Sequence, residues 1–484
     1  MRVSLLIGLK IVEGRPELNV MLIALDTLRS DYLGCYGHSK PTSPNIDKLA
    51  ERGIRFANSF SHTNCTLPGF TTIMTGMYSI THDVIAHDPP VPIQSGLLTA
   101  PEIFKRLGYK TLAADNLKHM RPWLGRGYDE YRSPTDPETS PARAAAEDVE
   151  RIAMALLEEY RHEDFFLFVH YWDPHQPYLP PPEHDKFYQG TEEDSKDPSN
   201  RSLKAWRSSY FMGRTYRPEI TDADRIISLY EGEVHRCDAS VGRLLEKLEE
   251  LDISDETLVV LLSDHGEIMN EPNCTFLGQP VRFCHLDLYD NVLRTPFILY
   301  HPSRLPRGKV LEPLVQHVDV LPTILAILEE EPPTKYELEG INLLPIIDGE
   351  REETRDWIEL SEHTYQAKRG VRTREWKFLR IEHASIGLSK GRALFELYNL
   401  RDDPEELKNV VDVWPEVAAE LEGLLEEWTQ RQISKWEKTN PFLTQPISSM
   451  GIESAKNTIM RIRRDSTLPE KVGIREQTGV SFTK

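Results

Sequence analysis

Long apolar segments and closely spaced cysteines are both missing from this chain of 484 residues. No stretch reaches the roughly 18 apolar residues that a membrane-spanning helix requires, so we expect no membrane partner. The run from Val3 to Leu9 is too short for the apolar core of a signal peptide. The five cysteines are scattered, without the spacing of a zinc ribbon, which favours a reduced, cytoplasmic location.

Positive charge is also scarce. The chain has 57 lysines and arginines against 77 aspartates and glutamates, for a formal net charge of -20. Such a surface repels nucleic acid and anionic lipid, so we expect neither as a partner. A small anionic ester remains an allowed substrate, because a bound cation reverses the local sign of the charge.

Three short apolar runs have the composition of strands that are buried on both faces of a parallel sheet. They are Leu18 to Leu25, Phe165 to His170 and Thr257 to Ser263, and amphipathic helical stretches lie between them. This alternation predicts an α/β fold, with a large mixed and mainly parallel sheet that is covered by helices on both faces.

Each apolar run ends in polar side chains. Asp26 follows the first run, Asp173 and His175 follow the second, and Asp264 and His265 follow the third. Ligands of open α/β sheets bind beyond the carboxyl ends of the strands. These side chains therefore predict one shared site.

The pattern changes after about residue 350. Residues 351–432 contain short alternating strands and a closing helix, which predicts a small C-terminal α+β unit after a catalytic domain of residues 1–350. Residues 433–484 are polar, and we expect either an arm through which two copies of the chain associate or a mobile end.

Six segments, in this order, resemble blocks of the sulfatase family within the alkaline phosphatase superfamily. They are DTLRSDYLGCYGHSKPTSPNIDKLAERGIRF, NCTLPGFTTIMTGMYSITHDV, FFLFVHYWDPHQPYLPP, TLVVLLSDHGE, HLDLYDNVLRTPFILY and VQHVDVLPTIL. The resemblance extends through WKFLR and FELYNLRDDPEE to about residue 430. It implies the fold of alkaline phosphatase and the hydrolysis of an ester.

The resemblance changes at the nucleophile. Sulfatases carry Cys-x-Pro-x-Arg there, and the cysteine is oxidised to formylglycine. In this chain Thr66 takes the cysteine position and Phe70 the arginine position, while Cys65 lies one residue out of register. The Gly-Lys-x-His block of sulfatases is altered too, with Asn116 and Lys118 at the lysine and histidine positions.

The same loop resembles the nucleotide pyrophosphatase/phosphodiesterase branch of the superfamily. That branch has Thr-x-Pro, then Thr-Gly and His-Gly, at places held here by Thr66-Leu67-Pro68, Thr75-Gly76 and His82-Asp83. Its phosphate-binding asparagine falls at His87. The resemblance implies a phosphodiester or phosphonate monoester hydrolase with a covalent intermediate on Thr66.

The chemistry of the nucleophile also favours hydrolysis of a phosphate ester, because a threonine cannot become formylglycine. Water must then cleave an ordinary ester on Thr66, which proceeds more readily at phosphorus than at sulfur. Two alternatives stay open: a sulfatase that works without formylglycine, and a metal-binding protein of this fold without catalytic activity.

Asp26, Asp264 and His265 offer hard or borderline donors to one or two divalent ions, which we expect to be zinc, manganese, magnesium or calcium. Pro68 suits the first turn of a helix, so Thr66 is expected at a helix N-terminus, on or beside the ion.

A second group is expected to face Thr66 from the opposite wall. His175 and His285 would take part in catalysis, and the group would hold a second ion or grip the substrate oxygens. The full set of candidates for it is Asp173, His175, His285, His87 and Asn116. His170, at the end of a strand, is expected to be structural.

Overall fold

The structure is a computed structural model that describes residues 18–135, 144–197, 199–200, 202, 219–272, 275–276, 279–280, 282–382 and 394–449. The predicted C-terminal arm of residues 433–484 lies outside the described residues from residue 450 onward. Within the described ranges, no helix combines the length and the apolar composition needed to cross a membrane.

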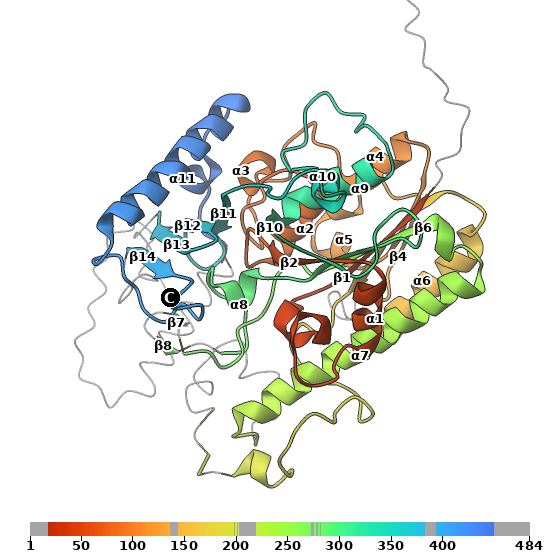
Figure 1. Ribbon diagram of the computed structural model, residues 1–484, viewed down its shortest axis with the longest axis horizontal. Coiled ribbons are helices and arrows are strands. Elements are labelled where there is room, and N and C mark those ends of the chain that lie inside the picture. Colours follow the sequence, from red (N-terminus) through yellow and green to blue (C-terminus); the bar gives the residue numbers. More distant parts are fainter. Residues whose placement is uncertain are drawn as a thin grey trace, which may run out of the picture.

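An eight-stranded sheet forms the centre of the molecule (Figure 1). Its order is β10-β2-β9-β6-β1-β5-β3-β4, and only β9 runs antiparallel to its neighbours. The strands are β1 Asn19–Leu25, β2 Ile54–Phe60, β3 Lys110–Ala114, β4 Glu130–Arg132, β5 Phe165–Tyr171, β6 Thr257–Leu262, β9 Phe297–Tyr300 and β10 Lys309–Gln316. The prediction of a mixed, mainly parallel sheet is confirmed.

Helices cover both faces of this sheet (Figure 1). One face carries α1 Pro44–Arg52, α6 Ala146–Tyr160 and α7 Ala223–Glu250, and the other carries α2 Thr66–Thr75, α4 Ala100–Arg106 and α9 Val320–Ile327. Strand β1 shows why the central strands read as unbroken apolar runs. Met21 and Ile23 pack into the first layer, while Val20 and Leu22 pack into the second.

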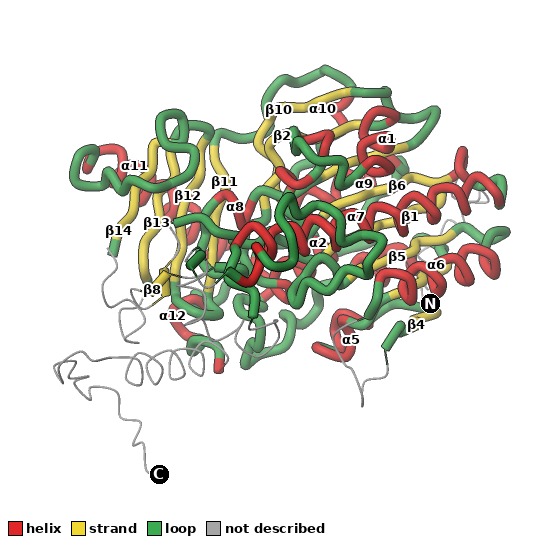
Figure 2. The backbone as a smooth tube through the Cα atoms, turned by 90° about the horizontal axis from the view of Figure 1, so that it is seen from below, coloured by secondary structure: helices red, strands yellow, loops and turns green. Residues whose placement is uncertain are grey.

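A second, antiparallel sheet lies beside the first (Figure 2). It consists of β11 Trp357–Glu362, β12 Lys368–Thr373, β13 Trp376–Ile381 and β14 Phe395–Asn399, in that order, and α11 Pro415–Lys435 packs on it through Leu421 and Leu425. The predicted small sheet with one closing helix is confirmed. The division of the chain at residues 350 and 432 stays a prediction.

Short elements complete the described part. The helices are α3 Ser79–His82, α5 Leu117–Met120, α8 Asp290–Leu293, α10 Leu344–Ile347 and α12 Pro441–Thr444, and a hairpin joins β7 Thr275–Phe276 to β8 Gln279–Pro280. The 3-10 helices are Ser30–Tyr32, Gly34–Tyr36, Pro122–Gly125, Asp194–Lys196, Ser254–Glu256 and His317–Asp319.

Buried ion pairs join the small sheet to the segment around α8. The ammonium group of Lys368 on β12 lies 2.6 Å from Asp287 Oδ1 and 2.9 Å from Glu396 Oε1. The ammonium group of Lys377 on β13 lies 2.5 Å from Asp290 Oδ1. Both lysine side chains are fully buried, and their charges compensate those of the carboxylates that they contact.

We expect Lys368→Met to destabilise the protein by about 3–5 kcal/mol, because it leaves two carboxylates buried without their cation. The matched control is Arg374→Ala, which breaks an ion pair with Glu353 between partly exposed side chains and should cost about 0–1 kcal/mol. Denaturant unfolding of both variants measures the difference. Equal losses would contradict a structural role of the buried pair.

Candidate metal and ester-binding site

The carboxyl ends of β1 and β6, which are neighbours in the sheet, bring three ligand-type side chains together. Asp26 directly follows β1, and Asp264 and His265 come after the end of β6. One donor atom from each residue lies within 4.8 Å of the other two, and all three residues are buried. The structure thus gathers the residues that the sequence proposed as ligands of one ion.

Hydrogen bonds orient this set and leave donor atoms free. Asp264 Oδ1 accepts the backbone N–H of Thr27 at 3.1 Å and that of His265 at 2.9 Å, while Oδ2 has no hydrogen-bond partner among the described residues. Both carboxylate oxygens of Asp26 are likewise without one in the described ranges. His265 Nδ1 lies 2.9 Å from the carbonyl oxygen of Gly266, which leaves Nε2 available. This donor set fits a divalent ion.

Two carboxylates buried side by side dominate the electrostatics. Burial, together with the charge of Asp26, raises the pKa of Asp264 well above its usual value. Burial also acts to raise the pKa of Asp26, but its contact with His170 and the charges of His175 and His265 outweigh burial and lower it. Burial and the charge of His285 hold the pKa of His265 well below its usual value, which favours the neutral imidazole that binds metals.

Thr66 is the first residue of α2, as the sequence predicts. Its Oγ1 lies 3.4 Å from His265 Nε2, beside the candidate ligands. Gly69 permits this approach, since a Cβ there would lie 3.3 Å from the backbone oxygen of Asp264. The N-terminus of α2 therefore points its free N–H groups and its positive dipole into the site, where an anion is favoured.

Cys65 precedes the helix and makes a different contact. Its thiol donates to Thr364 Oγ1 at 3.1 Å, and burial raises the pKa of the thiol. Thr364 follows β11 and also accepts the backbone N–H of His87 at 2.9 Å. The small sheet thus reaches the nucleophile loop, through a residue that nothing in the sequence pattern identified.

Three histidines stand together in the site. The ring of His285 lies 4.6 Å from that of His265 and 5.3 Å from that of His175, measured between centroids. The side-chain amide of Asn64, in the Thr66 loop, donates to the carbonyl oxygen of His285 at 3.0 Å. The structure therefore brings His175 and His285 close to the candidate metal ligands, as the sequence predicts.

Glu267 is a site residue that sequence reasoning missed. Its buried Oε1 lies 3.4 Å from Nδ1 of His285. A single antiparallel bridge between Ile268 and Cys284 holds residues 267 and 285 opposite each other. Burial acts to lower the pKa of His285, but the hydrogen bond and charge of Glu267 outweigh burial and raise it. The sequence offers one indication of Glu267, because it is the glutamate of the Asp-His-Gly-Glu segment that carries the family resemblance.

The remaining candidates have more varied surroundings. Asp173 is fully buried, and its Oδ2 lies 3.4 Å from Nη1 of Arg236 on α7. His87 is near the histidine group, since burial and the charges of His285 and His175 lower its pKa to about 4. Asn116 is buried at the start of α5.

His170, expected to be structural, contacts a candidate ligand. Its Nε2 lies 3.6 Å from Asp26 Oδ2, and its Nδ1 lies 2.8 Å from Asp115 Oδ1. Burial acts to lower the pKa of His170, but the two carboxylates raise it to about 9. The ring thus lies between two carboxylate groups.

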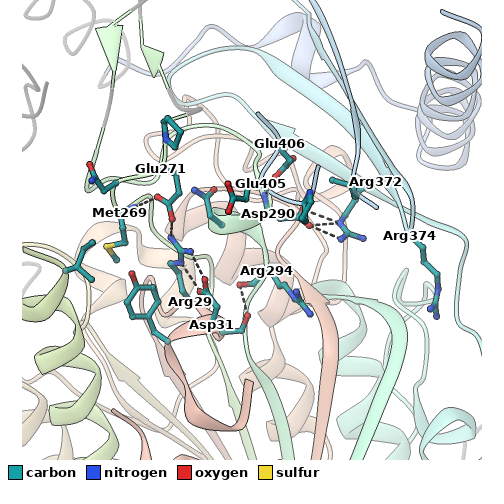
Figure 3. A pocket seen from close by; sticks show the side chains of 18 residues that line it. Arg29, Asp31, Met269, Glu271, Asp290, Arg294, Arg372, Arg374, Glu405 and Glu406 are labelled. Carbon is teal, nitrogen blue, oxygen red and sulfur yellow. Dashed lines mark hydrogen bonds and ion pairs between the residues drawn. The ribbon is translucent and has the colours of Figure 1, made fainter. Parts of the chain in front are cut away.

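A cavity of about 610 Å³ lies elsewhere, beside the loops that follow β1 and β6 (Figure 3). Its guanidinium groups already have partners: Arg29 contacts Asp31 at 2.6 Å and Glu271 at 2.5 Å, and Arg372 contacts Asp290 at 2.8 Å. None of the three candidate metal ligands lines it, so we assign the chemistry to the cluster around Thr66.

Comparison with known proteins identifies two families. The profile of the family described as Sulfatase matches residues 18–330, and that of the family described as N-sulphoglucosamine sulphohydrolase, C-terminal, matches residues 282–432. A curated relative, the N-acetylglucosamine-6-O-sulfatase of Bacteroides thetaiotaomicron, is 23% identical over 501 residues, covering 86% of each chain.

Two solved structures share the fold. One is described as a complex with its substrate, D-glucosamine-2-N,6-O-disulfate; its TM-score is 0.68 at 19% identity, covering 88% of this chain and 100% of that chain. The other is the phosphonate monoester hydrolase of Agrobacterium radiobacter, with a TM-score of 0.68 at 20% identity. The match covers 86% of this chain and 96% of that chain. At these identities the likeness is one of architecture, which confirms the predicted alkaline-phosphatase-like fold.

Adding zinc or manganese to chelator-treated protein should raise its melting temperature, because an ion that binds only the folded state at about 100 times its Kd stabilises it by about 2.7 kcal/mol. Asp264→Ala should lose this shift. Asp173→Asn should keep it, since the carboxylate of Asp173 contacts Arg236 instead. Thermal melting with metal analysis measures both, and a wild-type shift in Asp264→Ala would refute the ligand assignment.

Proposed function

This chain belongs to the sulfatase family, and on that premise we propose that it hydrolyses sulfate esters at the site around Thr66. The family profile covers residues 18–330, which is more than half of the chain and includes Asp26, Thr66, Asp264 and His265. The observation that carries the proposal is the cluster of two carboxylates and one imidazole at the N-terminus of α2. As a member of this family, the chain is a hydrolase of ester bonds, as the sequence predicts.

The expectation of a phosphate ester as substrate is wrong. The matching family and the curated relative of 86% coverage are sulfatases, and the phosphonate monoester hydrolase shares the fold at only 20% identity. That expectation rested on Thr66 and its neighbours alone. The residue at the nucleophile position governs how the covalent intermediate is cleaved, whereas the rest of the site grips a tetrahedral anion of either element.

Asp26, Asp264 and His265 would hold a divalent ion, with Thr66 beside it. When bound, the ion supplies positive charge that favours the deprotonated threonine hydroxyl and withdraws electron density from the ester. The N-terminus of α2 adds N–H groups that orient the sulfate oxygens. His175 completes the grip on those oxygens from the opposite wall.

The chain's own residues carry the bond changes. A bond forms between Thr66 Oγ1 and sulfur, and the bond from sulfur to the ester oxygen breaks. Because Glu267 engages Nδ1 of His285, Nε2 is left to protonate the leaving oxygen. The protons balance, since the threonine hydroxyl loses one and the released alcohol gains one. Water then breaks the bond between Oγ1 and sulfur and releases hydrogen sulfate.

The neighbouring thiol supports Thr66 as the nucleophile. The thiol of Cys65 donates a hydrogen bond to Thr364, and burial raises the pKa of the thiol, so it is poorly suited to attack an ester. Thr66 Oγ1 instead lies within 3.4 Å of a candidate metal ligand. We therefore propose a sulfatase that works without formylglycine.

Thr66→Ala should lower turnover of p-nitrophenyl sulfate by about 10⁴-fold or more, the scale seen when a covalent nucleophile is removed. Cys65→Ala is the adjacent control and should retain most of the activity. Mass spectrometry of the loop peptide should show an unmodified cysteine. An aldehyde at position 65, or full activity in Thr66→Ala, would return the nucleophile to Cys65.

Parallel assays of p-nitrophenyl sulfate, p-nitrophenyl phosphate and p-nitrophenyl phenylphosphonate separate the ester classes. We expect the highest kcat/KM with the sulfate. Efficient turnover of the phosphonate with no turnover of the sulfate would refute the proposed function.

His285→Ala should slow the hydrolysis of alkyl sulfates by about 10²–10⁴-fold, and that of p-nitrophenyl sulfate much less, since nitrophenolate departs without a proton. Glu267→Gln should slow both reactions as well, but by a smaller factor, because Glu267 only orients the ring of His285. Comparing kcat across leaving groups measures the effect. A loss that is equal for all leaving groups would exclude proton donation by His285.

A further inference from the structure

A line of polar side chains, three of them buried and the outermost half-buried, crosses four neighbouring strands and ends on the candidate metal site. Strands β1, β5, β3 and β4 are consecutive in the sheet, and each contributes one residue at or near its carboxyl end. In this order the residues are Asp26, His170, Asp115 and Tyr131. Only Asp26 is a candidate metal ligand, and the other three extend from it toward the β4 edge of the sheet.

Hydrogen-bond contacts link Tyr131, Asp115 and His170, and an ion-pair contact longer than a hydrogen bond links His170 to Asp26. The hydroxyl of Tyr131 hydrogen-bonds Oδ2 of Asp115, whose Oδ1 lies 2.8 Å from Nδ1 of His170. Nε2 of His170 in turn lies 3.6 Å from Oδ2 of Asp26. Both nitrogens of one ring thus face carboxylate oxygens, so the ring joins Asp115 to Asp26.

Packing fixes each link in place. The ring of Phe70, on α2, meets His170 edge-on with centroids 4.8 Å apart, and Trp172 lies on it at 6.0 Å. From the start of α5, the backbone N–H of Leu117 donates to Asp115 Oδ1 at 3.0 Å. These contacts prevent Asp115 and His170 from turning toward other partners.

Asp115 is the member of this line at which the chain departs from the sulfatase blocks. Asp115 stands where the Gly-Lys-x-His block has its glycine, and Asn116 stands at the lysine. A glycine there has no side chain with which to hold His170. A carboxylate that supports a histidine next to a metal ligand is the arrangement by which proteins orient ligands from the second layer around an ion.

We propose that Asp115, His170 and Tyr131 are positioning residues that hold the Asp26 carboxylate in its metal-binding orientation. The inference rests on the proposed function, because it assumes that Asp26 binds the ion of the hydrolytic site. His170 fixes the plane of the Asp26 carboxylate through Oδ2, Asp115 fixes the ring of His170, and Tyr131 fixes Asp115. The Asp26 carboxylate can then bind the ion without first having to rotate.

The test measures the affinity of the chelator-treated full chain for zinc and manganese, by competition with a metal-responsive indicator. We expect Asp115→Asn and His170→Gln each to weaken affinity by about 10–100-fold. The double variant should be about as weak as the worse single variant, because the contacts act in series. Tyr131→Phe removes only the outermost hydroxyl and should weaken affinity by a smaller factor.

Asp129→Asn is the matched control. Asp129 precedes β4 and lies at the opposite end of the β3–β4 pair, where its Oδ2 accepts the backbone N–H of Thr111 at 3.1 Å. This variant removes a carboxylate from the same two strands and should leave metal affinity unchanged.

Wild-type affinity in folded Asp115→Asn and His170→Gln would overturn the proposal, as would an equal loss in Asp129→Asn. If those two variants lack a cooperative melting transition, Tyr131→Phe decides, and wild-type affinity there counts against the proposal. A wild-type chain that binds neither ion would refute the metal site itself, and with it the proposed function. The two failures can be told apart: in one the wild-type chain binds no metal, and in the other the wild type and the variants bind metal equally well.

Discussion

The burial of two carboxylates side by side is the constraint on which the site depends. Asp26 and Asp264 are fully buried at the ends of adjacent strands, where like charges repel strongly because little water screens them. Nearby groups offset this repulsion: His170, whose pKa Asp115 and Asp26 raise, the N-terminus of α2 and the proposed metal ion. A fold that did not need this ion would gain stability by replacing one of the two aspartates with an apolar residue.

The small C-terminal sheet is part of the site as well as an appended unit. Lys368 and Lys377 fix the segment around α8 through buried ion pairs, and His285 lies only two residues before one of their partners, Asp287. Thr364, at the end of β11, holds the thiol of Cys65. The sheet therefore determines where His285 stands and which way Cys65 points, and both affect Thr66.

The fold and the gathering of the three candidate ligands could be predicted from sequence because both depend on local patterns. Apolar runs that end in aspartate identify strands, and parallel strands present their carboxyl ends at one edge of the sheet, which brings Asp26 and Asp264 together. Glu267, Asp115 and the role of His170 could not be predicted in this way. Their partners lie on other strands, and the spacing of residues along the chain does not reveal the order of strands in the sheet.

Replacing formylglycine with threonine changes what the rest of the site must accomplish. A formylglycine hydrate has a second hydroxyl that can expel sulfate from the enzyme, whereas Thr66 has one hydroxyl, so in the proposed reaction water would have to cleave the bond between Oγ1 and sulfur. The water must reach sulfur on the side opposite Thr66, so a base is needed on the far wall. His285, with Glu267 at its Nδ1, is the proposed base, because once it had protonated the leaving oxygen its Nε2 would be ready to accept a proton from water. In this way the same histidine would serve both halves of the reaction.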